Sequence, residues 1–313
     1  MTADASRTAR ERALRHVAAL SSGPPIPPLW RITAHFHPDR AVHGRLMLDA
    51  LADDGVYRSQ FVTGTGNGGL TARPGGDRWC WESRIFGGAY DDAPAEDRPV
   101  YGALDHRRRA AGAAPRFGSA HLRLAEGTLA RATFCYPDSA AEPSAFGVAT
   151  RMRLVALARA DRRDALDDYV EAQVHGPVRL DRDVEALVLD PCYRGTAVEQ
   201  AARRMPCPVE WHGGFRLGVA ELRRHADYRG QRYVDLGAEI ARCGRLDPGV
   251  IGDAARTGRH DPQELKKVWH CLARFGAPPP SGDAPPPVAV PGTGGLAVPR
   301  RPTGRPVSEQ RGG

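Results

Sequence analysis

One stretch of the chain, residues 29–69, constrains the fold most, because it joins a short alternating segment to a helical segment and a glycine-rich run. In Trp30 to His37 apolar and polar residues alternate, which is the period of a half-buried strand. One face of this strand carries Arg31, Thr33, His35 and His37. We predict that this strand belongs to a sheet and that its polar face carries side chains able to bind a ligand or take part in catalysis.

The residues that follow predict a helix, a second strand and a ligand-contacting loop. Apolar residues recur at about one helical turn over Ala41 to Asp53, and Gly55 is well placed to end that helix. Val56 to Thr63 can form a strand. The glycines from Gly64 to Gly69 would let the backbone approach a ligand closely.

A second informative region lies at residues 168–189. Its first strand is predicted at Tyr169 to His175, and one face carries Tyr169, Glu171, Gln173 and His175. Val184 to Leu189 is apolar enough for a central strand. Glu171 is therefore expected to project from a sheet, either into a site or into a cross-strand pair with an arginine.

Aromatic residues gather between these regions, at Trp79, Trp81, Phe86 and Tyr90. Such rings either line a pocket for a planar ligand or pack in the core. Glu82 lies among them and needs a partner if it is buried, for which Arg84 and Arg98 are the candidates.

The chain is expected to be an α+β protein with a split, mixed and mostly antiparallel sheet. We divide it into an N-terminal helix with a proline-rich linker (1–28), an α+β core domain (29–225), a C-terminal helical cap (226–276) and a disordered Pro/Gly-rich tail (277–313). Each chain end carries +2 of the net charge of +7, which leaves +3 for the central body. A basic nucleic-acid stripe is therefore not required.

No apolar run approaches the roughly 20 residues that cross a bilayer, and no secretory signal is recognisable. We expect a cytoplasmic protein without a membrane partner. The six cysteines form no CxxC pair. The motifs of P-loop, dinucleotide-fold and serine-hydrolase proteins are absent from the sequence.

Three functions fit these residues. His35 or His37, Tyr57 or Tyr90, and Glu171 would suit chemistry at the anomeric carbon of a sugar, where a carboxylate stabilises an oxocarbenium-like transition state. A metal-dependent hydrolase would instead use the His35/His37 pair with a third ligand from His212, Asp39 or Glu82. A non-catalytic module that binds a nucleotide or peptide is the third possibility.

Several motifs resemble an uncharacterised bacterial protein family known only as a domain of unknown function. They are HFHPDR, LADDGVYRSQFVTGTGNGG, RIFGGAYDD, RPVYGALD and PRFGSAHLRL, and the resemblance covers residues 29–276. It names a family without naming an activity.

The order of a histidine-bearing first strand, a helix ending in glycine, the FGGAY segment and a late strand of the YVEAQV type also resembles ADP-ribosyltransferases, including the poly-ADP-ribose polymerase and DNA-modifying toxin branches. That resemblance implies a first-strand contact to the NAD ribose by His35, with His37 as the alternative, stacking on nicotinamide by Tyr90, and a catalytic carboxylate at Glu171. NAD would be a substrate, no metal would be needed, and the acceptor is a protein, a nucleic acid or a small molecule. The expected cofactor contacts are Arg31, His37, Tyr57, Thr63, Gly64, Asn67 and Tyr90.

Overall fold

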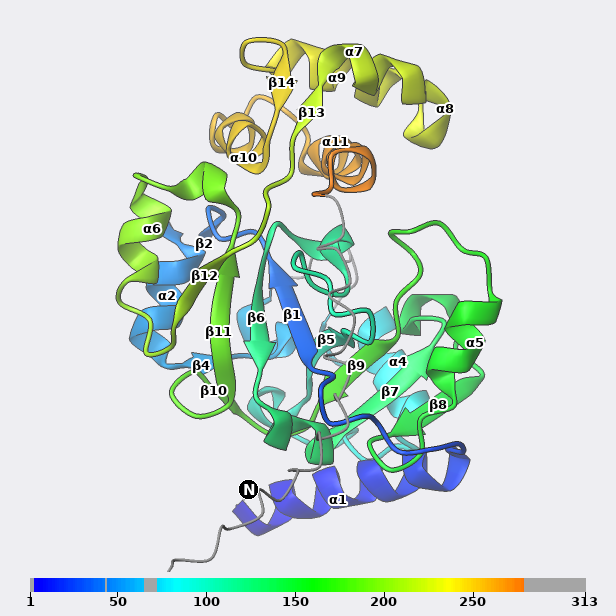
Figure 1. Cartoon of the computed structure of the whole chain (residues 1–313). Helices are drawn as coiled ribbons and strands as arrows, with labels where there is room; N and C mark the ends of the chain where they lie inside the picture. Colours follow the sequence, from blue (N-terminus) through cyan, green and yellow to red (C-terminus); the bar gives the residue numbers. More distant parts are fainter. Residues whose placement is uncertain (1–2, 43, 65–71, 279–313) are drawn as a thin grey trace, which may run out of the picture. The chain divides into compact units, whose positions relative to one another are not determined.

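An eight-stranded sheet organises the chain in the computed structural model, which describes residues 3–42, 44–64 and 72–278 (Figure 1). The strand order is β12-β11-β6-β1-β5-β9-β7-β8. Only β11 and β12 pair in parallel, so the sheet is mixed and mostly antiparallel. This confirms the predicted α+β class. The strands are β1 (Ile32–Phe36), β5 (Val100–Leu104), β6 (Ala120–Leu124), β7 (Ala132–Tyr136), β8 (Ala145–Val148), β9 (Glu171–Val174), β11 (Val184–Leu189) and β12 (Val209–Trp211).

The strand β1 lies inside the sheet, paired with β5 on one side and β6 on the other. All five of its residues are buried. Its apolar residues Ile32, Ala34 and Phe36 belong to the main hydrophobic core. Three helices contribute to this core, namely α2 (Met47–Asp54), α5 (Leu154–Ala160) and α6 (Ala197–Ala202). The alternation read from the sequence thus describes a strand that is covered on both faces.

A second hydrophobic cluster joins the N-terminal helix α1 (Ala3–Leu20) to the aromatic segment near residue 86. Val17 of α1 packs there with Phe86 and Tyr90, both of which are fully buried. The helix α4 (Asp77–Ile85) precedes this segment and carries Arg78 and Glu82 as buried charged residues. Core packing, one of the two interpretations of these rings, is the correct one for Phe86 and Tyr90.

The prediction for residues 41–63 was partly wrong. A two-stranded hairpin, β2 (Ala41–Val42) with β3 (Arg45–Leu46), precedes the helix, which begins only at Met47. Gly55 ends this helix as predicted, with φ of 64° and its N–H donated to Leu51. The predicted second strand is limited to β4 (Val56–Tyr57), paired with β10 (Val178–Arg179), and is followed by the short helix α3 (Gln60–Thr63). Short β-branched runs do not distinguish a strand from a helical turn.

The last part of the described chain is helical, as predicted. It comprises the two-stranded pair β13 (Leu217–Gly218) with β14 (Arg245–Leu246) and the helices α7 (Val219–Leu222), α8 (Ala226–Arg229), α9 (Gln231–Ile240), α10 (Pro248–Arg256) and α11 (Pro262–Phe275). The sequence also predicts a helix from Gln263 to Phe275 that Asp261 opens. The start of α11 confirms this, because Asp261 accepts hydrogen bonds from the N–H groups of Gln263 and Glu264. These helices share their own hydrophobic cluster.

Short 3₁₀ turns connect the main elements. They are η1 (Ala95–Asp97), η2 (Pro115–Phe117), η3 (Glu126–Arg131), η4 (Ser139–Ala141), η5 (Pro191–Tyr193) and η6 (Arg223–His225). The sequence predicts a strand from Phe117 to Leu124, but Phe117 belongs to η2 and the strand β6 begins only at Ala120.

Two predictions fall outside the described residues: the ligand-contacting loop beyond Gly64, which includes Asn67, and the tail from residue 279 onwards. Among the described helices, none combines the length and the apolar character needed to cross a bilayer.

Candidate functional site

The register of the central strands aligns polar residues on one face of the sheet. Thr33 of β1 lies opposite Ala103 of β5, and Ala103 lies opposite Glu171 of β9. Directly opposed residues in antiparallel strands point to the same face. Tyr101 is two residues from Ala103 and therefore shares this face. The adjacent strands β1, β5 and β9 thus bring His35, Tyr101 and Glu171 to the same side.

A narrow cavity of about 70 Å³ opens at this polar face, and we call it the sheet pocket. It is lined by Thr33, His35, Tyr57, Gln60, Arg78, Tyr101, Gly102, Ala114, Phe117 and Glu171. Three of the predicted site residues, His35, Tyr57 and Glu171, therefore meet in one cavity.

The carboxylate of Glu171 is held by several donors. Its Oε1 accepts from Gln173 Nε2 at 2.9 Å, and its Oε2 accepts from Ser139 Oγ at 3.1 Å. The residue is 7% exposed. Burial raises the pKa of Glu171, and the nearby Arg78 guanidinium opposes that rise. The site therefore holds an oriented carboxylate whose charge depends on Arg78.

Hydrogen bonds connect Glu171 to Tyr90. Thr133 Oγ1 donates its one hydrogen to Gln173 Oε1 at 2.9 Å. In its contact with His175 Nε2, also at 2.9 Å, Thr133 must therefore accept, and His175 Nε2–H is the donor. His175 Nδ1 then accepts from the Tyr90 hydroxyl at 2.8 Å. Burial lowers the pKa of His175 to about 3, which keeps this ring neutral.

The structure places Tyr90, the predicted nicotinamide-stacking residue, away from the sheet pocket. Tyr90 is fully buried beside Phe86 and does not line the sheet pocket. It lies at the far end of the hydrogen-bond chain that orients Gln173, and through Gln173 the carboxylate of Glu171.

The aromatic residue that does line the pocket is Tyr101. Its hydroxyl donates to Glu82 Oε1 at 3.0 Å, and Arg98 Nη1 donates to the other oxygen of Glu82 at 2.7 Å. Arg98 is thus the partner of Glu82, one of the two predicted candidates. Burial raises the pKa of Glu82 to about 7, and Arg98 opposes the rise. This buried group fixes the position of the Tyr101 ring.

Arg78 covers the Tyr101 ring, with its guanidinium carbon 4.2 Å from the ring centre. The residue is 6% exposed. Its Nε and Nη1 atoms are buried and have no hydrogen-bond partner among the described residues. Unpaired buried donors are costly, so the pocket offers two donors to an oxygen of a ligand or to water.

His35 lines the pocket, but both of its ring nitrogens are engaged. Nδ1–H donates to the Gly118 carbonyl at 3.1 Å, and Nε2 accepts from the Ala114 N–H at 3.2 Å. Burial lowers the pKa of His35 to about 3, so the ring is neutral. In this structure His35 holds the 112–118 loop beside the pocket and has no nitrogen left for a ribose.

The other predicted cofactor contacts are dispersed. Arg31 pairs with Glu185 at 2.7 Å and lines none of the described pockets. His37 and Thr63 line neighbouring cavities rather than the sheet pocket. Gly64 ends α3 with φ of 61° and donates its N–H to Gln60. Of the described cofactor contacts that the sequence predicted, only Tyr57 reaches the sheet pocket.

The side chains predicted for a metal site are not grouped. His212 Nε2 bonds to Ser119 O at 2.8 Å, and its Nδ1 accepts from Gly214 N. Glu82 is paired with Arg98, and Asp39 is paired with Arg256. Within residues 3–42, 44–64 and 72–278, no three His, Cys, Asp or Glu side chains are arranged to hold a metal ion.

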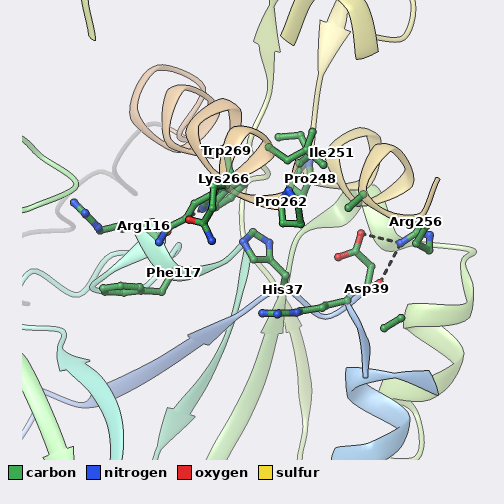
Figure 2. Close-up of a pocket in the computed structure, with 16 residues that line it drawn as sticks. His37, Asp39, Arg116, Phe117, Pro248, Ile251, Arg256, Pro262, Lys266 and Trp269 are labelled. Atoms are coloured by element: carbon green, nitrogen blue, oxygen red, sulfur yellow. Dashed lines mark hydrogen bonds and ion pairs between the residues drawn. The ribbon is translucent and has the colours of Figure 1, made fainter. Parts of the chain in front are cut away.

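Two larger cavities adjoin the sheet pocket. The first, of about 270 Å³, shares Tyr57 and Gln60 with it and is lined mainly by α2 and α3. The second, of about 340 Å³, shares Phe117 with it and lies against α10 and α11 (Figure 2). We call the second one the cap pocket.

Sequence reasoning missed Arg78 and Tyr101 as pocket residues. The signal for Tyr101 was available. The sequence predicts a strand at Val100 to Leu104, which β5 confirms, and its alternation places Tyr101 and Ala103 on one face. Arg78 left no such signal, because its position depends on how α4 packs on the sheet.

The fold and the pocket define an α+β protein with a buried carboxylate site on a mostly antiparallel sheet. Comparison with protein families adds a specific assignment: a family described as a protein of unknown function (DUF3626) matches residues 31–160 and 149–275. The chain belongs to this family. None of the curated proteins matches it.

Proposed function

We propose that the chain is an NAD-using enzyme of the ADP-ribosyltransferase type, which releases nicotinamide and passes ADP-ribose to an acceptor or to water. One observation carries the proposal. His35, Tyr101 and Glu171 lie on the adjacent strands β1, β5 and β9 and line one pocket. The resemblance to these enzymes implies a first-strand histidine and a late-strand glutamate at such a site, whereas the aromatic residue of this pocket is Tyr101 instead of Tyr90.

Glu171 supplies the central chemical group. When the bond between the ribose and nicotinamide breaks, the bonding electrons leave with nicotinamide and positive charge develops on the ribose. A fixed carboxylate beside that carbon stabilises this charge. The same carboxylate can align a water molecule or an acceptor for attack. Ser139 and Gln173 already hold it in one orientation.

The walls of the sheet pocket suit a small planar group. Tyr57, Tyr101 and Phe117 provide rings, and Arg78 provides buried donors for an oxygen. In this proposal Tyr101 takes the ring-contact role that the sequence had given to Tyr90. His35 acts as a positioning residue, since its nitrogens hold the neighbouring loop.

Nicotinamide release tests the proposal. The purified full chain is incubated with NAD, and the Glu171→Gln variant is compared with Glu142→Gln, whose side chain is 77% exposed. We expect Glu171→Gln to slow release by about 100-fold or more, because it removes charge with little change in shape. NAD affinity should stay within about twofold, and Glu142→Gln should match the wild type.

Three results would contradict the proposal. Release that survives in Glu171→Gln would remove Glu171 from the chemistry. Wild-type protein that binds NAD without any release would favour the binding-module function, and protein that does neither would exclude NAD as the substrate.

A further inference from the structure

The cap pocket is the largest of the three described cavities, at about 340 Å³, and lies within the volume range of small-ligand sites. Its walls come from the end of β1, from η2 and from α10 and α11. Figure 2 shows His37 near its centre, with Lys266 and Trp269 above and Asp39 beside Arg256. Neither Glu171 nor Tyr101 lines this cavity.

Positive charge dominates the lining of the cap pocket. Four cationic side chains, Arg40, Arg116, Arg256 and Lys266, face one carboxylate, Asp39. Acidic residues already pair with some of them, since Arg116 contacts Asp167, and Arg256 contacts Asp39 and Asp253.

Lys266 is different from the paired arginines. It makes no hydrogen bond or ion pair within the described part of the chain, and Arg116 and Lys267 are its charged neighbours. Partial burial and these two cations lower its pKa. A lysine held among cations without a carboxylate leaves an unneutralised donor, which an anionic ligand would satisfy.

The remaining wall is apolar and aromatic. Pro248, Ile251 and Leu265 line it, and Trp269 is fixed by donating its Nε1–H to the Pro115 and Arg116 carbonyls. This wall suits a planar, weakly polar group.

His37 adds hydrogen-bonding capacity to this wall. Its ring meets the Trp269 ring edge-on at 4.9 Å. Neither of its nitrogens has a hydrogen bond within the described residues, and burial lowers its pKa to about 4. A neutral imidazole presents one donor and one acceptor to a ligand.

We propose that the cap pocket binds a nucleoside phosphate, with the phosphate at Lys266 and Arg116 and the planar base beside His37 and Phe117. A phosphate and a base together use both the cationic and the aromatic parts of the wall, which neither a simple anion nor an apolar ligand would do. Glu171 does not line the cap pocket, so ligand binding there can be measured separately from the proposed reaction. The ligand of the cap pocket is either the phosphate-bearing half of NAD or a separate nucleotide.

Calorimetric titration of the full chain with ADP at low salt tests the proposal. We expect saturable binding that Lys266→Gln weakens by about tenfold or more, because a charged hydrogen bond to phosphate is lost. Lys267→Gln removes the same charge from the next residue of α11, which does not line the pocket, and should change affinity less than twofold.

His37→Phe keeps an aromatic ring at this position and removes the ring nitrogens, so it should also weaken ADP binding. Adenosine and inorganic phosphate alone should each bind more weakly than ADP.

A competition experiment identifies the source of the phosphate. Displacement of ADP by NAD assigns the pocket to the phosphate-bearing half of NAD, and simultaneous binding assigns it to a second nucleotide.

Absence of saturable ADP binding, or equal losses of ADP affinity in Lys266→Gln and Lys267→Gln, would overturn the proposal. Glu171→Gln should leave ADP binding unchanged, so a failure of the proposed catalysis would be seen separately.

Discussion

The pKa of Glu171 in the sheet pocket depends on opposing influences from its surroundings. Burial disfavours its ionised form, and the Arg78 guanidinium favours that form. Asp138 also faces this group and raises its pKa further. A carboxylate that stabilises a developing cation must be ionised. Arg78 therefore has two roles at the residue scale, as a donor to a ligand oxygen and as the counter-charge of Glu171.

The Arg78→Gln variant tests the second role through the pH profile of nicotinamide release. Release should fall with decreasing pH as Glu171 becomes protonated, and loss of Arg78 should move this acidic limb to higher pH, because the cause that lowers the pKa is removed. Arg84→Gln on the exposed side of the same helix is the matched control and should keep the wild-type profile. An unchanged limb in Arg78→Gln would show that Arg78 does not set the charge of Glu171.

At the scale of elements, the site depends on how β1 holds the loop before β6. His35 binds the loop at Ala114 and Gly118. Gly118 lies so close to β1 that an added Cβ would come within 2.2 Å of the Phe36 carbonyl atoms. Real Cβ atoms do not approach backbone so closely, so only glycine fits there without movement.

Gly118→Ala should therefore lower the free energy of unfolding by about 1–3 kcal/mol or more, since the loop must shift away from β1. Gly127→Ala is the control, because an added Cβ at Gly127 meets nothing within 4 Å, and its effect should stay within about 0.5 kcal/mol. Urea unfolding followed by circular dichroism measures both. Equal stability of the two variants would contradict the close packing of the loop on β1.

For the whole molecule, buried titratable groups predict acid sensitivity. Burial lowers the pKa values of six histidines, which are His35, His37, His106, His121, His175 and His270. The unfolded chain binds protons at these histidines below about pH 6.5, and the folded chain does not, so they destabilise the fold as pH falls. Burial raises the pKa values of Asp39, Glu82, Asp105 and Glu171, which has the opposite effect between about pH 4 and 7.

The six histidines outnumber these four carboxyl groups, and below about pH 4 the carboxyl groups are protonated in both states. We expect the free energy of unfolding to decrease modestly between pH 6.5 and 4.5 and steeply below that. Urea midpoints at pH 7, 5.5 and 4 measure this dependence. A higher midpoint at pH 4 than at pH 7 would contradict it.

Local sequence determined the elements whose signals are short-range. The alternation in β1 and in the Glu171 strand, the left-handed Gly55 after α2 and the Asp261 cap of α11 were all readable, because strand period and helix capping depend on residues a few positions apart. The polar face that carries His35 and Glu171 follows from the same alternation.

Only the tertiary structure decided which strands are neighbours, and with that the composition of the site. The pairing of β1 with β5 and of β5 with β9 brings Tyr101 into the pocket, and the packing of α1 buries Tyr90 away from it. Arg78 lines the sheet pocket because of how α4 packs on the sheet. His37 and Lys266 line one cavity because α11 packs on η2. Sequence period fixes the face of a side chain, but contacts between distant segments are set by burial of the whole chain.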